Sequence, residues 1–218
     1  MRSYARPIHL VTALTAIAAL TLQLALVVHG SSVLVETNRP GLWLRVGRFF
    51  SYFTIQSNIL VAVTATWLTR RPFVSGRLFA ALRVAALVGI TITGVVYYFL
   101  LRPLLDLSGA SAVADNLLHV AVPILAVIDW VVAGPRGRVS GGAIRDAYVW
   151  PVLWLAWTLM IGATTRWFPY PFLDWHHTSA LHVTVVCVGI FVFASALFAL
   201  AFWLDRRLDR APEIQRSP

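Results

Sequence analysis

Lysine is absent from this chain, cysteine occurs once, and charged residues make up only 12% of its 218 residues. Soluble domains carry about twice that charged fraction, so the scarcity of charge excludes an ordinary water-soluble protein. The lone Cys187 excludes a disulfide framework and a thiolate metal site. Outside the apolar runs, no basic stripe combines with an aromatic platform, so we expect no nucleic-acid partner despite the net charge of +9.

Hydrophobic residues fill the chain instead, at 59% of the total and a mean hydropathy of +0.75. A helix needs about 20 apolar residues to cross a bilayer, and no run alternates apolar and polar residues as barrel strands do. We therefore predict an all-α polytopic membrane protein, with residues 1–205 forming a bundle of six transmembrane helices and residues 206–218 a disordered cytoplasmic tail. The predicted spans are Ile8–His29, Phe49–Leu68, Leu78–Leu101, Ala112–Ala133, Tyr148–Thr165 and Ser179–Leu204.

Arginine sets the predicted orientation. One side of this topology carries twelve arginines and the other five, with Arg83 inside the third span. Because arginine concentrates in cytoplasmic loops, both termini are predicted to be cytoplasmic, and the positive charge then attracts anionic lipid headgroups. Arg83 and Asp129 lie near the cytoplasmic face, where they can snorkel or pair. The sequence indicates no other polar cluster in that half.

The second predicted span contains a polar block, Thr54, Gln56, Ser57 and Asn58. Polar groups within a membrane segment are costly and usually have a partner or a function. Residues 54, 57 and 58 fall on one helical face, whereas Gln56 points elsewhere, toward another helix. At 1.5 Å per residue, Thr54 is expected about 8 Å below the outer end of its helix.

A second polar group, Asp115, Asn116 and His119, interrupts the fourth predicted span. His119 is expected about 10 Å below the outer end, a depth that matches that of Thr54. Asp115 and Asn116 share the face of His119, so Asp115 can orient the imidazole as the third member of a nucleophile–base–orienter set.

Other polar and aromatic residues gather at the predicted outer ends of the helices. The last outer loop runs from Trp167 to His177 and contains two prolines. We expect a polar pocket in the outer half of the bundle, capped by this proline-stiffened aromatic loop. The further residues expected at that end are His29, Tyr97, Tyr98, Arg102, Arg166 and His182.

Structural alternatives exist for each candidate. A threonine in a membrane helix most often bonds the carbonyl four residues earlier, here Phe50, and a histidine can simply join two helices. The side chains of Asp174, His176, His177 and His182 could hold a metal ion, but their spacing matches no recognised ligand pattern. We therefore expect neither a metal nor a cofactor.

The residues Tyr52-Phe-Thr-Ile-Gln-Ser-Asn58, Asn116-x-x-His119 and Tyr170-Pro-Phe-Leu-Asp174 resemble the androgen-induced protein family. That family includes the androgen-dependent TFPI-regulating protein and bacterial membrane proteins, and these blocks resemble its bacterial branch. The resemblance implies six spans, a bacterial cytoplasmic membrane, and hydrolysis of fatty acid esters of hydroxy fatty acids. It also implies that Thr54 is the nucleophile and His119 the general base, with a lipid ester as substrate and membrane lipids as surroundings.

The residues leave several details open. Asp115 or Asn116 would orient His119, Ser57 or Asn58 would donate to the oxyanion, and Ser57 could replace Thr54 as nucleophile. A non-catalytic lipid-binding protein or scaffold would have the same bundle. A transporter should also show a polar route through the cytoplasmic half or broken helices in repeated halves, and the sequence indicates neither. The oligomeric state stays open.

Overall fold

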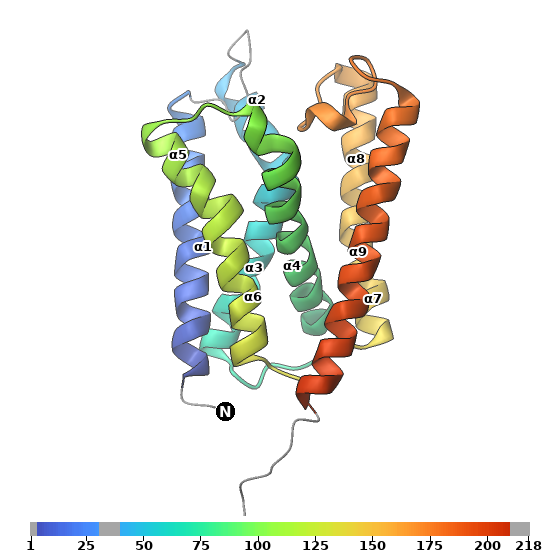
Figure 1. Cartoon of the computed structure of the whole chain (residues 1–218). Helices are drawn as coiled ribbons and strands as arrows, with labels where there is room; N and C mark the ends of the chain where they lie inside the picture. Colours follow the sequence, from blue (N-terminus) through green and yellow to red (C-terminus); the bar gives the residue numbers. More distant parts are fainter. Residues whose placement is uncertain (1–3, 31–39, 210–218) are drawn as a thin grey trace, which may run out of the picture.

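The described part of the chain, residues 4–30 and 40–209 of a computed structural model, consists of helices that run alongside one another (Figure 1). The prediction of an all-α protein is confirmed, since these residues contain no strand. The α-helices are α1 (Ala5–Val28), α2 (Leu42–Ser51), α3 (Phe53–Arg70), α4 (Arg77–Val96), α5 (Gly109–Asn116), α6 (Val122–Ile128), α7 (Gly141–Ala147), α8 (Val149–Thr165) and α9 (Ala180–Asp209). The π-helical turns are η1 (Tyr97–Leu101), η3 (Leu117–Ala121) and η4 (Asp129–Ala133), and the 3₁₀ turns are η2 (Arg102–Leu104) and η5 (Pro171–Leu173).

Within the described residues, five helical stretches are long and apolar enough to cross a membrane. They are Ala5–Val28, Arg77–Leu104, Gly109–Ala133, Gly141–Thr165 and Ala180–Asp209. The chain is therefore a multi-pass membrane protein by the length and composition of its helices. The predicted span Phe49–Leu68 is not confirmed, and with it the count of six spans, because α3 does not meet the same criterion. Its hydroxyl and amide side chains lower the hydropathy of its 18 residues.

The predicted start of the second span at Phe49 is wrong. Tyr52 is extended (φ −71°, ψ 130°) and separates α2 from α3, which begins at Phe53. Thr54 consequently lies in the first turn of a helix, where backbone N–H groups lack partners within the helix, and not about 8 Å below its start. This position gives Thr54 a different chemistry from that of a threonine in a continuous membrane helix.

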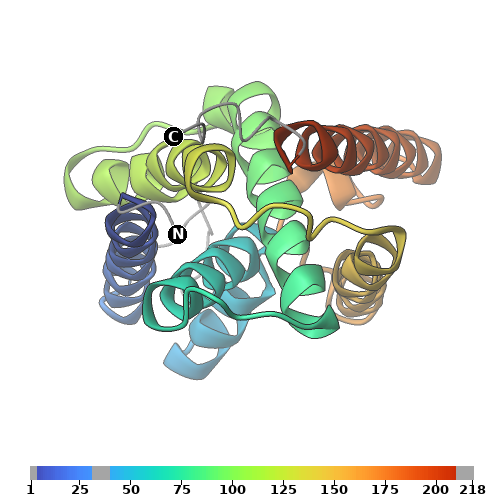
Figure 2. The same cartoon turned by 90° about the horizontal axis from the view of Figure 1, so that it is seen from below.

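Helix α4 occupies the middle of the bundle and separates two groups of helices (Figure 2). On one side, α3 packs most extensively against α1 and α4, and the segment from α5 to η4 packs against α1 and α4. On the other side, α7 and α9 pack against α4. The first turn of α1 and the last turn of α9 lie at the same end of the bundle (Figure 1).

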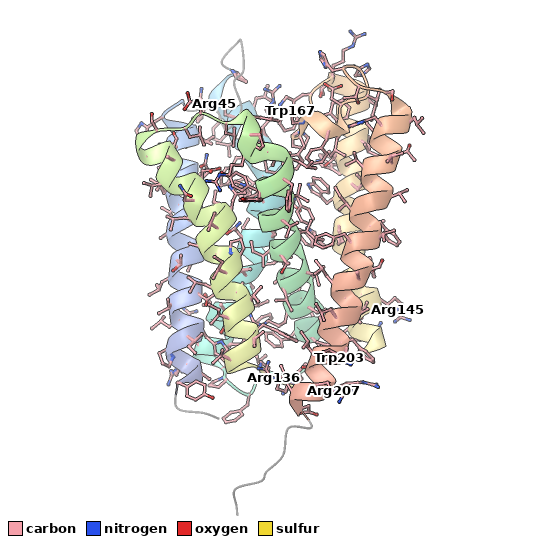
Figure 3. All side chains as sticks on the ribbon, viewed as in Figure 1. Arg45, Arg136, Arg145, Trp167, Trp203 and Arg207 are labelled. Atoms are coloured by element: carbon pink, nitrogen blue, oxygen red, sulfur yellow. The ribbon has the colours of Figure 1, made fainter. Side chains whose placement is uncertain are left out.

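Arginine and tryptophan side chains mark both ends of the bundle (Figure 3). Arg45 and Trp167 lie at one end, hereafter the Trp167 end, where the Arg48 guanidinium stacks 4.7 Å from the ring centroid of Trp167. At the other end, the Trp203 end, Arg207 stacks 5.4 Å from the ring centroid of Trp203. Such pairs are typical of membrane–water interfaces. The predicted tail overlaps the last turn of α9, which ends at Asp209, and its residues 210–218 lie outside the described part of the chain.

A buried ionic network lies in the half of the bundle near the Trp203 end, where the sequence predicts no polar cluster beyond Arg83 and Asp129. The pairing of these two residues is confirmed, with Arg83 Nη2 2.7 Å from Asp129 Oδ2. His9 Nδ1 lies 2.5 Å from Asp129 Oδ1 and completes the network. All three residues are buried, and they connect α1, α4 and η4. The expectation that this half lacks a polar cluster is therefore wrong, because His9 is hidden in an otherwise apolar run.

We expect Asp129→Ala to destabilise the protein strongly. The substitution leaves the buried guanidinium of Arg83 without its carboxylate, and removing one member of a buried ion pair typically costs about 3–5 kcal/mol. Asp146→Ala is the matched control, because its partner Arg77 is 67% exposed and ion pairs of this kind contribute little to stability. Thermal unfolding in detergent micelles measures both, and an equal loss of melting temperature would contradict a central role for the network.

Candidate active site

Thr54 and His119 lie side by side, as the sequence predicts. Thr54 Oγ1 is 3.3 Å from His119 Nε2, and both side chains are buried. Thr54 comes from the first turn of α3, and His119 comes from η3. The Thr54 hydroxyl therefore has a partner on another helix, and Gln56 Nε2 instead donates to the Phe50 carbonyl at 2.9 Å. The distance of 3.3 Å lies just beyond usual hydrogen-bond length, which is common where a catalytic contact tightens only with substrate.

Asp115 fixes the imidazole of His119. His119 Nδ1 lies 2.9 Å from Asp115 Oδ1 and 3.0 Å from the backbone oxygen of the same residue. Both oxygens are acceptors, so they favour the tautomer that carries its proton on Nδ1. Nε2 is then free to accept the proton of the Thr54 hydroxyl. This is the order of groups found in nucleophile–base–orienter sets.

Tyr97 supports the same pair from a third helix. Its hydroxyl donates to Asp115 Oδ2, and its ring stacks on the His119 imidazole at 4.1 Å and 13°. The sequence places Tyr97 only at the correct end of the bundle, because no spacing rule relates residues on different helices. Gly94 favours the close approach of α4 to η3, since a Cβ at this position would lie only 3.3 Å from the backbone oxygen of His119.

Two of the site residues stand in π-helical turns. Tyr97 opens η1, and His119 lies in η3. Such turns are rare, and they occur frequently at functional sites because the wider turn redirects side chains. Asp129, in the buried ionic network, begins the third π-helical turn of the described residues. Local geometry thus departs from the regular α-helix where polar side chains must meet.

Tyr170 reaches the site from the loop between α8 and α9. Its hydroxyl lies 3.3 Å from Thr54 Oγ1, and it accepts a hydrogen bond from the Thr54 backbone N–H at 3.2 Å. Burial raises the pKa of the Tyr170 phenol, against the lowering effect of these bonds, so the phenol stays protonated and can donate. The sequence signals this residue only through its loop motif, because it is 116 positions away from Thr54.

The loop that carries Tyr170 folds over the pocket, as predicted. The Phe168 ring lies where a Cβ on Gly162 would be, 2.0 Å from its nearest atom, so this glycine allows the loop to pack on α8. Asp174 closes the loop by accepting from the His176 backbone N–H at 2.9 Å and by pairing with His177 Nδ1 at 2.6 Å. Burial opposes ionisation of Asp174, but its hydrogen bonds outweigh burial and hold its pKa below the usual range.

The carboxylate of Asp174 is thus occupied within its own loop. Among the described residues, no three histidine, cysteine or acidic side chains gather closely enough to hold a metal ion. The loop instead positions aromatic side chains over the pocket.

Three predicted supporting residues occupy other positions than expected. Asn116 is exposed and donates to the Ala112 carbonyl at 2.8 Å, so it does not reach His119. Ser57 donates to the Thr54 carbonyl at 3.0 Å and lies 2.9 Å from Thr93 Oγ1. Asn58 donates to the carbonyls of Thr54 and Leu118 at 2.8 and 3.2 Å. Their donors are used inside the protein, and we interpret Ser57 and Asn58 as supports of the first turn of α3. Gln56 behaves as predicted and accepts from Trp150 Nε1 on α8 at 2.7 Å.

Thr54 lies in the linings of two cavities. The first, of about 140 Å³, lies between α3, α4, α8, α9 and η5 and is almost entirely apolar. The second, of about 50 Å³, is also mostly apolar, but Asp115 and His119 and polar groups from α1 and α5 line part of it. Thr54, Leu101 and Tyr170 line both, whereas His119 lines only the second. Ser57 and Asn58 line neither of the two. We call them the apolar cavity and the polar cavity.

The chain matches none of the protein-family models, curated proteins or solved structures with which it was compared. A functional conclusion therefore rests on the geometry of the site.

Proposed function

We propose that the protein is an intramembrane hydrolase of lipid esters, with Thr54 as nucleophile and His119 as general base. The observation that carries this proposal is the buried series Asp115–His119–Thr54–Tyr170, in which each neighbouring pair of polar atoms is 2.9 to 3.3 Å apart. Polar groups in a membrane protein are expensive to bury, and a hydroxyl held between an imidazole and a second hydroxyl is the arrangement that activates a nucleophile.

The proposed reaction is acyl transfer. His119 Nε2 takes the proton of the Thr54 hydroxyl while Oγ1 attacks the ester carbonyl carbon and forms a tetrahedral oxyanion. The intermediate collapses, the alcohol leaves with the proton from His119, and an acyl-Thr54 ester remains. Water, deprotonated by the same imidazole, then attacks this ester, and the acid and free Thr54 result.

The first turn of α3 supplies the electrostatic stabilisation. The Thr54 N–H points out of a helix N-terminus, where the helix dipole favours negative charge. The Tyr170 hydroxyl lies at the same point and remains protonated, so it can donate to the Thr54 alkoxide or to the oxyanion. We assign the role that the sequence predicts for Ser57 or Asn58 to the Tyr170 hydroxyl, which can donate while it accepts from the Thr54 N–H.

Tyr170→Phe tests this assignment. Loss of one such donor should lower kcat about 10²- to 10³-fold, because the charge that develops at the carbonyl oxygen or on Thr54 loses its partner. Tyr98→Phe is the matched control, since Tyr98 is 57% exposed on the surface of η1. Ester turnover in detergent micelles measures both variants. If Tyr170→Phe keeps full activity, the oxyanion must be held elsewhere.

We further propose that α3 also crosses the membrane, with the Trp203 end in the cytoplasm of a bacterial cell. Six crossings agree with α1 beginning and α9 ending at one end of the bundle, and the arginine excess selects that end as cytoplasmic (Figure 1). The pocket then lies in the outer half of the membrane, where the chains of a lipid ester can stay in hydrocarbon.

Cysteine accessibility tests this orientation. Cys187→Ala removes the native cysteine, and a cysteine is then introduced either at Gly141, at the Trp203 end, or at Trp43, which is 85% exposed in α2 near the other end. In spheroplasts, an impermeant maleimide should label the Trp43→Cys protein and spare the Gly141→Cys protein until the membrane is opened. Labelling of Gly141→Cys from outside would reverse the topology and place the pocket in the inner half.

A non-catalytic lipid-binding role is the second candidate, and the apolar cavity favours it. It leaves the Asp115–His119–Thr54 series without a purpose, and it predicts that no ester is cleaved.

A transporter would use the polar cavity for a solute. Arg83, His9 and Asp129 do not line either of the two cavities, so the buried ionic network does not extend them toward the Trp203 end.

A further inference from the structure

The two cavities indicate where the two portions of an ester substrate bind. Both are lined by Thr54 and Tyr170, so an ester carbonyl carbon within reach of Thr54 Oγ1 borders both cavities. One substituent of the ester must then enter the apolar cavity, and the other must enter the polar cavity. Which substituent enters which cavity follows from the position of the general acid.

His119 lines the polar cavity but not the apolar one. The same imidazole that takes the Thr54 proton must return it to the oxygen of the departing alcohol. That oxygen must therefore lie on the side of His119, within hydrogen-bond reach of Nε2. The alcohol portion is directed into the polar cavity, and the acyl chain is left with the apolar cavity on the other side of Thr54.

The linings agree with this assignment. The apolar cavity is walled by side chains such as Ile92, Val96, Leu155, Cys187 and Ile190. The polar cavity is smaller and mostly apolar, but it adds the side chains of Gln23 and Ser111 to those of Asp115 and His119. A hydrocarbon chain gains from burial in the first, and the hydroxyl of the departing alcohol finds hydrogen-bond partners in the second.

Resting on the proposed hydrolase function, we infer that the apolar cavity is the acyl-chain site and that the polar cavity receives the alcohol portion of the ester. An engineered apolar cavity of about 150 Å³ binds benzene, so the 140 Å³ cavity has room for an acyl segment of about six carbon atoms. We therefore expect kcat/KM to be higher for hexanoyl esters than for acetyl esters.

Cys187→Trp tests the acyl site, because the larger side chain fills the apolar cavity. Its matched control is Val188→Trp, the same substitution one residue along α9 at a position that is 55% exposed. With p-nitrophenyl acetate and hexanoate, Cys187→Trp should lower the ratio of kcat/KM for hexanoate over acetate at least about tenfold, the size of effect that a blocked apolar pocket gives. Val188→Trp should keep the wild-type ratio.

Ser111→Trp provides the reciprocal test from the polar cavity. With hexanoate esters of methanol and of 1,2-ethanediol, it should lower kcat/KM for the diol ester selectively and leave the acyl selectivity as in the wild type. If Cys187→Trp instead discriminates between alcohols and Ser111→Trp between acyl chains, the assignment is reversed and the proposal is wrong.

A binding measurement keeps the acyl site testable if the protein cleaves no ester or a variant fails to fold. Thr54→Ala protein in lipid nanodiscs is irradiated with a hexanoic acid that carries a terminal diazirine, and the cross-linked peptides are identified by mass spectrometry. Cross-links should map to the α8 and α9 residues that line the apolar cavity, and excess unlabelled hexanoic acid should suppress them. Cross-links at lipid-facing positions only would reject the acyl site, whereas loss of hydrolysis with these cross-links retained would reject the hydrolase alone.

Discussion

Thr54→Ala and His119→Ala are each expected to abolish ester hydrolysis, with kcat reduced about 10⁴- to 10⁶-fold. The two residues act as one unit, because Thr54 Oγ1 attacks only when His119 Nε2, 3.3 Å away, accepts its proton. Removing either member therefore removes nearly the whole effect, and the double variant should be no slower than either single variant. Turnover of p-nitrophenyl hexanoate by the purified protein in micelles measures all three.

Thr64→Ala is the control for the loss of a buried threonine. Thr64 lies on the same helix, is fully buried, and bonds the Leu60 carbonyl at 2.8 Å, so its loss affects packing but not the site. Thr54→Ser should retain measurable turnover, because it keeps the hydroxyl. Melting temperatures need parallel measurement, since a hydrogen bond between helices contributes about 0.6 kcal/mol. Undiminished turnover by well-folded Thr54→Ala protein would show that another residue is the nucleophile.

Asp115→Asn is expected to lower kcat by about three to four orders of magnitude with little change in KM. The amide keeps the shape of the carboxylate but can present an N–H to His119 Nδ1, which favours the wrong tautomer and removes stabilisation of the imidazolium. Because Asp115 acts through His119 and not on the substrate, the effect should appear in kcat. Asp146→Asn, in the ion pair with the exposed Arg77, should leave kcat within about twofold, as surface substitutions usually do.

A substitution at Tyr97 distinguishes the effect of the Asp115 charge from the effect of the hydrogen bond that positions this carboxylate. Tyr97→Phe removes the hydrogen bond to Asp115 Oδ2 and keeps the ring that stacks on His119. A smaller fall in kcat than that of Asp115→Asn is expected, because the carboxylate remains. If Asp115→Asn raises KM and leaves kcat unchanged, Asp115 contacts the substrate and does not orient the base.

Much of this arrangement could be predicted from composition and spacing. The apolar runs predict the helices, and the residues from 115 to 119 place a carboxylate one turn before a histidine on the same face. The prediction that Thr54 and His119 lie together is confirmed, although the helix start on which the predicted depth of Thr54 rests is wrong, because α3 begins at Phe53. The arginine bias predicts an orientation, which stays a prediction.

The remaining features depend on contacts between distant segments. No spacing relates Tyr170 or Tyr97 to Thr54 and His119, and only the folded loop and the close approach of α4 at Gly94 bring them there. The break at Tyr52 has no glycine or proline next to it to signal it, and the apolar sequence on both sides reads as one helix. Ser57 shares the face of Thr54, but its hydroxyl bonds the backbone and Thr93.

Identification of the covalently modified residue tests the central claim most directly. The activated hydroxyl should attack the phosphorus of a fluorophosphonate and displace fluoride. The folded protein is labelled in micelles, and the phosphonyl adduct is then located by peptide mass spectrometry. We predict an adduct on Thr54 in the wild type and none on Thr54 in His119→Ala. An adduct on Ser57, or an unmodified protein that also cleaves no ester, would contradict Thr54 as the nucleophile.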